Sequence, residues 1–200
     1  MSISSATVQA IMRSEPNLAH PDLKLQIMLV SGKDRYARSR KIGVDPFSGF
    51  NIGVFPIYPK SRGSTHIKST DPEEAPQIVA NYLSASADRE LTLKGLRLVR
   101  KVATQPTISP HIVREVRPGP AVEDDNALLD YARWSGQTSW HPISSCRMGH
   151  GVMDVVDHDL RVHGTEGLRI VDSSIMPNMP TSNTNAPSIV IGEKGADLIL

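Results

Sequence analysis

The segment from Asn185 to Leu200 is the feature that most constrains the fold of this chain. A helix over these residues would carry apolar side chains around nearly its whole circumference: Ile189, Val190, Ile191, Ala196, Leu198 and Ile199. In a globular protein, a helix that is apolar on nearly every side is buried. Asn185 can cap its N-terminus and Pro187 can occupy its first turn. We therefore expect a final helix that begins near Asn185 and is buried by the rest of the protein.

The composition is that of an ordinary globular chain. Of its 200 residues, 39% are hydrophobic and 22% are charged, which is enough to bury a core. The net charge is +1, with Lys and Arg scattered, so no basic surface for nucleic acid is expected. The single cysteine, Cys146, excludes an intramolecular disulfide and fits a reducing compartment. Without a leader-like start or about 20 consecutive apolar residues, we expect a soluble, cytoplasmic protein with no transmembrane segment.

The first part of the chain contains two predicted strands. Apolar and polar residues alternate from Leu23 to Leu29, as in a half-buried strand. Residues 33–49 are polar and basic, which predicts a loop or flap. Residues 51–59 resume strand character, and residues 64–70 follow a Ser-Arg-Gly turn. We expect these last two segments to pair as a hairpin.

Three further helices are predicted between the strands and the C-terminal part. Residues 71–74 supply a capping residue, a proline for the first helical position and an acidic first turn. Residues 88–104 have one apolar helical face. That face consists of Leu91, Leu98, Val99 and Val102. Asp124 or Asp125 caps a helix that runs through Tyr131.

From residue 140 onward, short strand-like segments are separated by Gly and Asp turns and lead to the final helix. The strings HPISSCRMG, VVDHDLRVHG, LRIVDSSIMP and NTNAPSIVIGEKGADLI occur there in this order. They resemble the C-terminal half of the glucose-methanol-choline oxidoreductases, flavin enzymes that oxidise alcohols. Upstream, YPKSRGSTHIKSTDP and a predicted helix ending in NYLS resemble the substrate-binding domain of the same family. Because all five strings occur in one order, the resemblance is specific.

The resemblance implies an α+β fold in two parts. Residues 1–135 would form a substrate-binding domain, an antiparallel sheet backed by helices and truncated at its N-terminus. Residues 136–200 would supply C-terminal strands and the last helix of an incomplete FAD-binding domain. No GxGxxG follows a predicted strand in these 200 residues, so the loop that seats the FAD diphosphate is not in this segment. We expect a C-terminal fragment that is inactive, or nearly so, without the FAD-binding N-terminal half; the alternative is a non-catalytic remnant or partner-dependent subunit.

His141 is implied by the resemblance to be the catalytic base. It would take the hydroxyl proton of an alcohol while hydride passes from the carbinol carbon to flavin N5. Imidazole is the side chain that titrates closest to neutral pH, which suits it to this role. Pro142 restricts the backbone of His141 to extended or turn conformations. Without the resemblance, a hydrogen-bonded structural histidine would be the ordinary interpretation.

Asn185 occupies the place of the second active-site residue of the family, which is either His or Asn. A neutral amide can donate to the substrate oxygen as negative charge grows there. Asn183 is the rival for this role, and helix capping is the structural alternative for both residues. The alcohol and the electron acceptor, whether oxygen, a quinone or a cytochrome, do not follow from the sequence.

Further FAD contacts are implied at three places. The N-terminus of the final helix, at Ala186 and Pro187, would lie against the pyrimidine side of the flavin, where its dipole favours negative charge. Trp140 with His141 resembles the flavin-contacting pair. Asp172 resembles a residue near the ribityl and diphosphate groups, although a turn carboxylate that accepts backbone amides is an equal alternative.

Two departures and two competing interpretations complete the sequence analysis. The family usually has Gly and Thr where this chain has Ser144 and Ser145, so fewer backbone conformations are expected beside His141. A hydrolase built on Ser144, His141 and Asp172 lacks the GxSxG elbow. A metal site is not expected, because no candidate ligand falls into a tight ligand spacing. The ligands considered are His141, His150, His158, His163, Asp154, Asp157 and Asp159.

Overall fold

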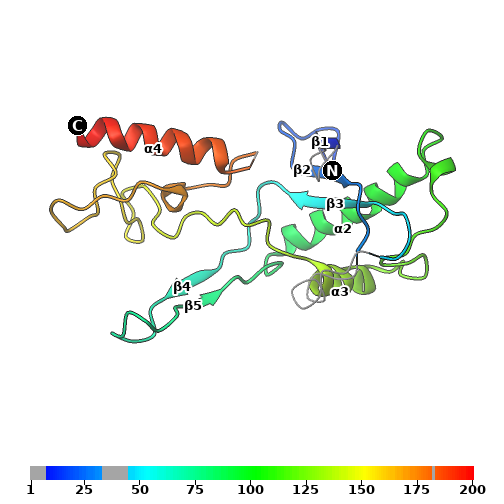
Figure 1. Ribbon diagram of the computed structural model, residues 1–200, viewed down its shortest axis with the longest axis horizontal. Coiled ribbons are helices and arrows are strands. Elements are labelled where there is room, and N and C mark those ends of the chain that lie inside the picture. The colour runs from blue at the N-terminus through cyan, green and yellow to red at the C-terminus, as the bar shows by residue number, and fades with distance from the viewer. Residues whose placement is uncertain (1–7, 33–44, 182) are drawn as a thin grey trace. The chain divides into compact units, whose positions relative to one another are not determined.

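The computed structural model describes residues 8–32, 45–181 and 183–200, which form two compact units (Figure 1). The first unit comprises the described residues up to Ser61 together with Leu83–Gln137. The second comprises Arg62–Tyr82 and Thr138–Leu200. The two units are defined by packing alone. The assignment of residues 1–135 to a substrate-binding domain and of residues 136–200 to an FAD-binding domain therefore stays a prediction. Most of the expected loop at 33–49 lies outside the described residues, and its last five residues contain no helix or strand.

The first unit is built on a three-stranded antiparallel sheet in the order β1, β2, β3. Its strands are β1 (Val8–Met12), β2 (Leu23–Met28) and β3 (Asn51–Pro56). The strands predicted near Leu23 and Asn51 are confirmed. The predicted partner of β3 is wrong, because β3 pairs with β2, placing Leu25 opposite Val54. Alternation of apolar residues identifies a strand but does not identify its partner.

Helix α2 (Ser86–Ala103) packs on this sheet and confirms the helix predicted at 88–104. The side chains of Leu23 and Leu25 are buried on the sheet, and Leu93 is buried on the helix. Gly95 permits close packing, since a Cβ at this position would lie 2.3 Å from Cγ1 of Val54. The core of the first unit therefore lies between α2 and the sheet.

Two acidic residues anchor the ends of helices in the first unit. Asp88 is buried, and its carboxylate accepts hydrogen bonds from the backbone N–H groups of Lys60 (2.8 Å) and Ser61 (2.7 Å). Asp124 caps α3 (Asp125–Ser135) by accepting a 3.0 Å hydrogen bond from Ala127 N–H. The predicted capping of this helix is confirmed, although the helix continues past Tyr131. A short 3₁₀ turn, η1 (Ser109–His111), lies between α2 and α3.

The second unit begins with an antiparallel hairpin formed by β4 (Ser64–His66) and β5 (Gln77–Val79) (Figure 1). The helix predicted to begin near Asp71 is therefore wrong. Asp71 instead holds a turn: its carboxylate accepts from Glu73 N–H (3.0 Å) and its carbonyl accepts from Glu74 N–H (3.2 Å). Pro76 would interrupt a helix that continued from this turn, because proline lacks the N–H needed in a helix interior.

Isolated bridges, rather than the predicted short strands, organise residues 138–175 of the second unit. The bridges join Met148 to Val156, Val156 to Val162, and Arg161 to Arg169. Val156, Leu160 and Ile175 form the buried core, with the 3₁₀ turn η2 (Ser173–Ile175) beside it. The prediction of strands is wrong here because the Gly and Asp turns follow one another too closely for any paired segment to extend.

Helix α4 (Asn185–Ile199) ends the chain and is covered on only one side. Ile191 and Leu198 pack on the core, and a Cβ on Gly195 would lie 2.2 Å from Cγ1 of Val171. Ile189 and Val190 are 59% and 66% exposed, so the predicted burial of this helix is wrong for the described chain. None of the helices in the described ranges is both long and apolar enough to cross a lipid bilayer.

Candidate functional site

The first component of the candidate site is a hydrogen bond between His141 and Thr184. His141 is half-buried in an irregular segment, and its Nδ1 lies 2.8 Å from Oγ1 of Thr184. Trp140, the preceding residue, has a left-handed backbone (φ 56°) and donates its backbone N–H to Oγ1 of Thr138 at 3.0 Å. Trp140 as a whole residue is 69% exposed. His141 is thus held by its imidazole to a residue 43 positions later in the chain.

Thr184 is buried and occupies the capping position of α4, yet its hydroxyl makes no capping hydrogen bond. A capping side chain normally accepts from the second or third N–H of its helix. The third residue of α4 is Pro187, which has no N–H. The backbone of Thr184 is also α-like (φ −76°, ψ −2°) rather than extended. The hydroxyl instead makes its hydrogen bond with His141, and Asn185 is the first helical residue rather than the predicted cap.

The predicted residues of the final helix lie next to this hydrogen bond. Asn183 and Asn185 flank Thr184 directly in the chain, and both are exposed. Ala186 is exposed and Pro187 is half-buried in the first turn of α4. Sequence reasoning missed Thr184 itself, although a threonine three residues before a proline at a helix start was a usable signal. The arrangement brings an imidazole to the start of α4, between two asparagines that flank Thr184 in the chain.

The segment that follows His141 is fixed to η2 by hydrogen bonds. Cys146 N–H donates to Ser174 O at 3.1 Å, and the Ser144 hydroxyl donates to Met176 O at 2.6 Å. The exposed Asp172 caps η2, since its carboxylate accepts from Ser174 N–H at 2.7 Å. Asp172 is thus a turn carboxylate that accepts a backbone amide, as in the structural alternative to FAD binding.

Ser144 adopts the left-handed conformation, with φ 68°. Glycine enters this region without cost, whereas a residue with a Cβ pays about 1 kcal/mol. The hydrogen bond from Ser144 to Met176 offsets part of that cost. A serine is thus tolerated at position 144, where the glucose-methanol-choline oxidoreductases usually have glycine.

Two of the aspartates among the possible metal ligands, Asp154 and Asp157, hold turns in the second unit. The carboxylate of Asp154 accepts a 2.7 Å hydrogen bond from Gly151 N–H and pairs with Arg147. Both contacts lower the pKa of Asp154, and the Gly151 contact has the larger effect. The backbone N–H of Arg161, at 2.9 Å, is the main cause of the lowered pKa of Asp157. In the part of the chain that the structure describes, no three His, Cys, Asp or Glu residues are grouped as metal ligands.

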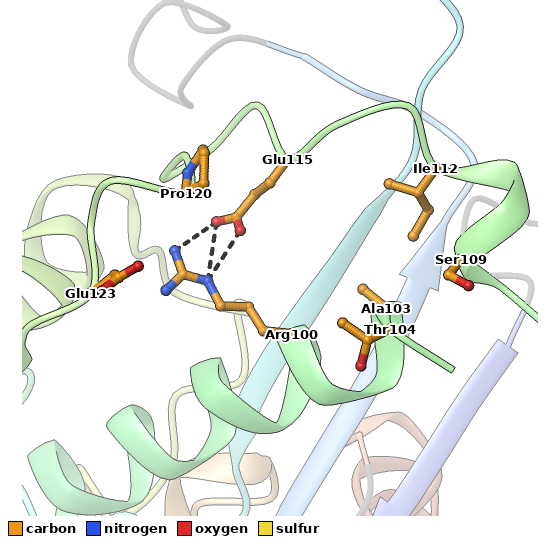
Figure 2. Close-up of a pocket in the computed structure, with 8 residues that line it drawn as sticks. All are labelled: Arg100, Ala103, Thr104, Ser109, Ile112, Glu115, Pro120 and Glu123. Carbon is orange, nitrogen blue, oxygen red and sulfur yellow. Dashed lines mark hydrogen bonds and ion pairs between the residues drawn. The ribbon is translucent and has the colours of Figure 1, made fainter. Parts of the chain in front are cut away.

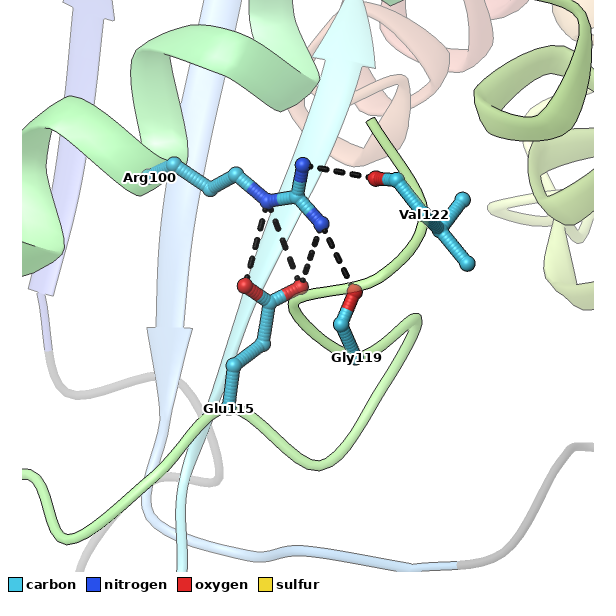
Figure 3. Close-up of polar contacts among 4 residues, drawn as sticks. All are labelled: Arg100, Glu115, Gly119 and Val122. Carbon is cyan, nitrogen blue, oxygen red and sulfur yellow. Dashed lines mark hydrogen bonds and ion pairs between the residues drawn. The ribbon is translucent and has the colours of Figure 1, made fainter. Parts of the chain in front are cut away.

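An open pocket of about 450 Å³ lies in the first unit, at the C-terminal end of α2 (Figure 2). Its lining residues are Arg100, Ala103, Thr104, Ser109, Ile112, Glu115, Pro120 and Glu123. None of the predicted site residues is among them. The guanidinium of Arg100 pairs with Glu115 (Nη2 to Oε1, 2.8 Å) and donates to the carbonyls of Gly119 (3.0 Å) and Val122 (2.8 Å) (Figure 3). Because all three nitrogens bind the chain, Arg100 secures the connection to α3 rather than a ligand.

Comparison with known proteins identifies the family to which most of this chain is similar. The family model described as GMC oxidoreductase matches residues 59–192. The chain is 45% identical over 151 residues to oxygen-dependent choline dehydrogenase of Pseudomonas syringae pv. tomato, covering 76% of this chain and 27% of that protein. It is 37% identical over 189 residues to alcohol dehydrogenase [acceptor] of Pseudomonas putida, covering 94% of this chain and 33% of that protein.

A solved structure has a similar fold. The chain superposes on pyridoxine 4-oxidase from Mesorbium loti with a TM-score of 0.84 and 25% identity, covering 96% of this chain and 37% of that structure. The chain therefore spans about a third of the length of the proteins that it matches.

Proposed function

This chain belongs to the GMC oxidoreductase family, and we propose that it is the C-terminal part of an FAD-dependent enzyme that oxidises an alcohol to an aldehyde or ketone. The observation that carries the proposal is the 2.8 Å contact between His141 and Thr184, which joins the proposed base to the start of α4. A primary or secondary alcohol would be the substrate. The single cysteine fits a reducing compartment, and the proposal places the enzyme in the cytoplasm.

The exposure of the residues around His141 supports a flavin ring bound at this place. Trp140 is 69% exposed, and the first turn of α4 presents Ala186 to solvent. The initial N–H groups of a helix have no partner within the helix, and its dipole favours negative charge at this end. Trp140, His141, Ala186 and Pro187 would hold the ring, and Asp172 would lie toward the ribityl chain. When bound, the flavin supplies the hydride acceptor.

Within this proposal, His141 accepts the hydroxyl proton of the alcohol as the carbinol hydride departs. Its Nδ1 is engaged by Thr184, so Nε2 is the nitrogen that would receive the proton. Asn185, or its rival Asn183, would donate an amide N–H to the substrate oxygen and stabilise its developing charge. The proton thus passes to the imidazole while the oxygen remains hydrogen-bonded.

We further propose that activity requires an FAD-binding half, fused to this chain or supplied as a separate subunit. The apolar side chains of Ile189, Val190 and Ile199, each more than half exposed on α4, support this proposal because they need a covering partner. The absence of a GxGxxG motif within these 200 residues supports it too. Titration of the chain with FAD, followed by flavin fluorescence, should give weak binding. Tight equimolar binding with alcohol-dependent bleaching would contradict this part of the proposal.

The base can be tested in a full-length protein restored by fusion to the FAD-binding half of a GMC relative. His141→Ala should slow flavin reduction by about 100-fold or more and leave the flavin content intact. His158→Ala is the matched control, because the side chain of His158 is 78% exposed and its rate should not change. Equal rates for both variants would refute the role of His141.

The same fusion distinguishes the two asparagines and the non-enzymatic alternative. Of Asn183→Ala and Asn185→Ala, the variant that loses flavin reduction without losing flavin identifies the oxygen-binding amide. If the fusion binds FAD but none of the primary, secondary and aromatic alcohols tested reduces the flavin, the result would instead support a non-catalytic remnant.

A further inference from the structure

We propose that Thr184 is a positioning residue that sets the orientation and the tautomer of His141. This inference rests on the proposed function, in which His141 is the base. The hydroxyl of Thr184 lies 2.8 Å from Nδ1 of His141 and belongs to a buried residue. This contact joins the irregular segment carrying His141 to the start of α4.

Two hydrogen-bond arrangements are compatible with this distance. If Nδ1–H of His141 donates to Oγ1 of Thr184, the neutral imidazole has a free lone pair on Nε2 and can accept a proton. If the hydroxyl donates to Nδ1, Nε2 carries the hydrogen and cannot act as a base. The role of His141 as base therefore requires the first arrangement, in which Thr184 is the acceptor.

The start of α4 keeps the hydroxyl available for this role. The hydroxyl makes no capping hydrogen bond, and Pro187 removes one of the two backbone N–H groups, those of the second and third helical residues, from which it could accept. The carbonyl of Thr184 accepts from both the backbone N–H (2.9 Å) and the hydroxyl (2.7 Å) of Ser188. These two bonds fix the backbone of Thr184 on the first turn of α4, and the orientation of the imidazole follows from that of the helix.

Thr184 supplies a neutral partner rather than a charged one. A carboxylate beside Nδ1 would orient the ring and also stabilise the imidazolium after proton transfer. A hydroxyl selects the tautomer and the orientation but adds no opposite charge. The expected effect of removing it is therefore smaller than that of removing the base itself.

The tautomer can be measured directly in the chain without flavin. Histidine ¹⁵N chemical shifts are recorded at about pH 9, where an imidazole of ordinary pKa is neutral. The His141 signals are assigned by their loss in His141→Gln. The wild type should show hydrogen on Nδ1 of His141. Thr184→Val keeps the volume but lacks the hydroxyl, so it should lose the preference for this tautomer. Thr184→Ser retains the hydroxyl and should keep the preference. Amide spectra of each variant establish that the fold is unchanged. Hydrogen on Nε2 in the wild type, or the same tautomer in Thr184→Val, would overturn the inference.

The restored full-length enzyme supplies the second measurement. Thr184→Val should slow flavin reduction about 10-fold to 100-fold at unchanged flavin content, and Thr184→Ser should stay within about threefold of the wild type. If His141→Ala slows reduction and Thr184→Val does not, only the role of Thr184 is refuted. If His141→Ala leaves the rate unchanged, the proposed function itself fails.

Discussion

At the scale of single residues, the backbone beside His141 depends on a serine in a conformation that favours glycine. Ser144 has φ 68° and donates its hydroxyl to Met176 O. Ser144→Ala should destabilise the fold by about 1 kcal/mol, because it loses the hydrogen bond and keeps the left-handed strain. Ser144→Gly loses the same bond but relieves about 1 kcal/mol of strain, so its stability should be close to the wild type. Urea unfolding of both variants checks this order; an alanine variant as stable as the glycine variant would contradict it.

Asp154 makes the turns of the second unit sensitive to acid. The Gly151 N–H is the largest cause, and Arg147 the next, of a lowered pKa of Asp154 in the folded state. The ionised carboxylate therefore stabilises the fold at pH values above the pKa of Asp154 in the unfolded chain. This contribution is lost as the pH falls through the lowered folded-state pKa. Asp154→Asn should therefore reduce stability at pH 7 and flatten its decline toward acid, as measured by urea unfolding over a pH series. Asp130→Asn, at an exposed ion pair, is the control for the loss of one surface carboxylate and should reduce the stability at pH 7 less than Asp154→Asn does; an equal loss in that control would show that the effect is not specific to Asp154.

At the scale of elements, α4 contains two glycines in opposite environments. A Cβ at Gly195 would lie 2.2 Å from Cγ1 of Val171, whereas nothing lies within 4 Å of a Cβ at Gly192. Gly192→Ala should stabilise the chain by up to about 1 kcal/mol through helix propensity. Gly195→Ala gains the same propensity but overpacks the core, which costs about 1–3 kcal/mol, so the net change should be destabilising. Thermal unfolding of the pair provides the test, and equal shifts of the melting temperature would contradict the close packing of α4 on Val171.

At the scale of the whole molecule, α4 presents both a covered and an uncovered apolar side. Val190 is 66% exposed, while its neighbour Ile191 packs against the core. We expect the isolated chain to bind an apolar dye such as ANS. Val190→Gln should reduce dye binding and change the free energy of unfolding by less than about 0.5 kcal/mol. Ile191→Gln should destabilise the fold by about 2 kcal/mol or more, because it buries a polar group. Comparable destabilisation by both substitutions would place both sides of α4 in the core.

Much of the fold follows from local sequence. The strands β2 and β3 and the helices α2 and α3 were predictable because periodicity and capping depend on residues a few positions apart. His141 and the resemblance to the family were also accessible, since the motif strings are contiguous. The helix expected at Asp71 was wrong because the same capping signals also suit a turn, and the next proline decided between them.

The sequence by itself therefore determined β2, β3 and the helices α2, α3 and α4, together with the family and the candidate base, because each is encoded over a short stretch of chain. The tertiary structure decided which strands pair, which side of α4 is covered and which hydroxyl binds His141. Strand pairing depends on contacts between distant segments, and His141 and Thr184 are 43 positions apart. The burial of α4 depends on how much surface the rest of the chain provides, and here that surface covers only one side of the helix.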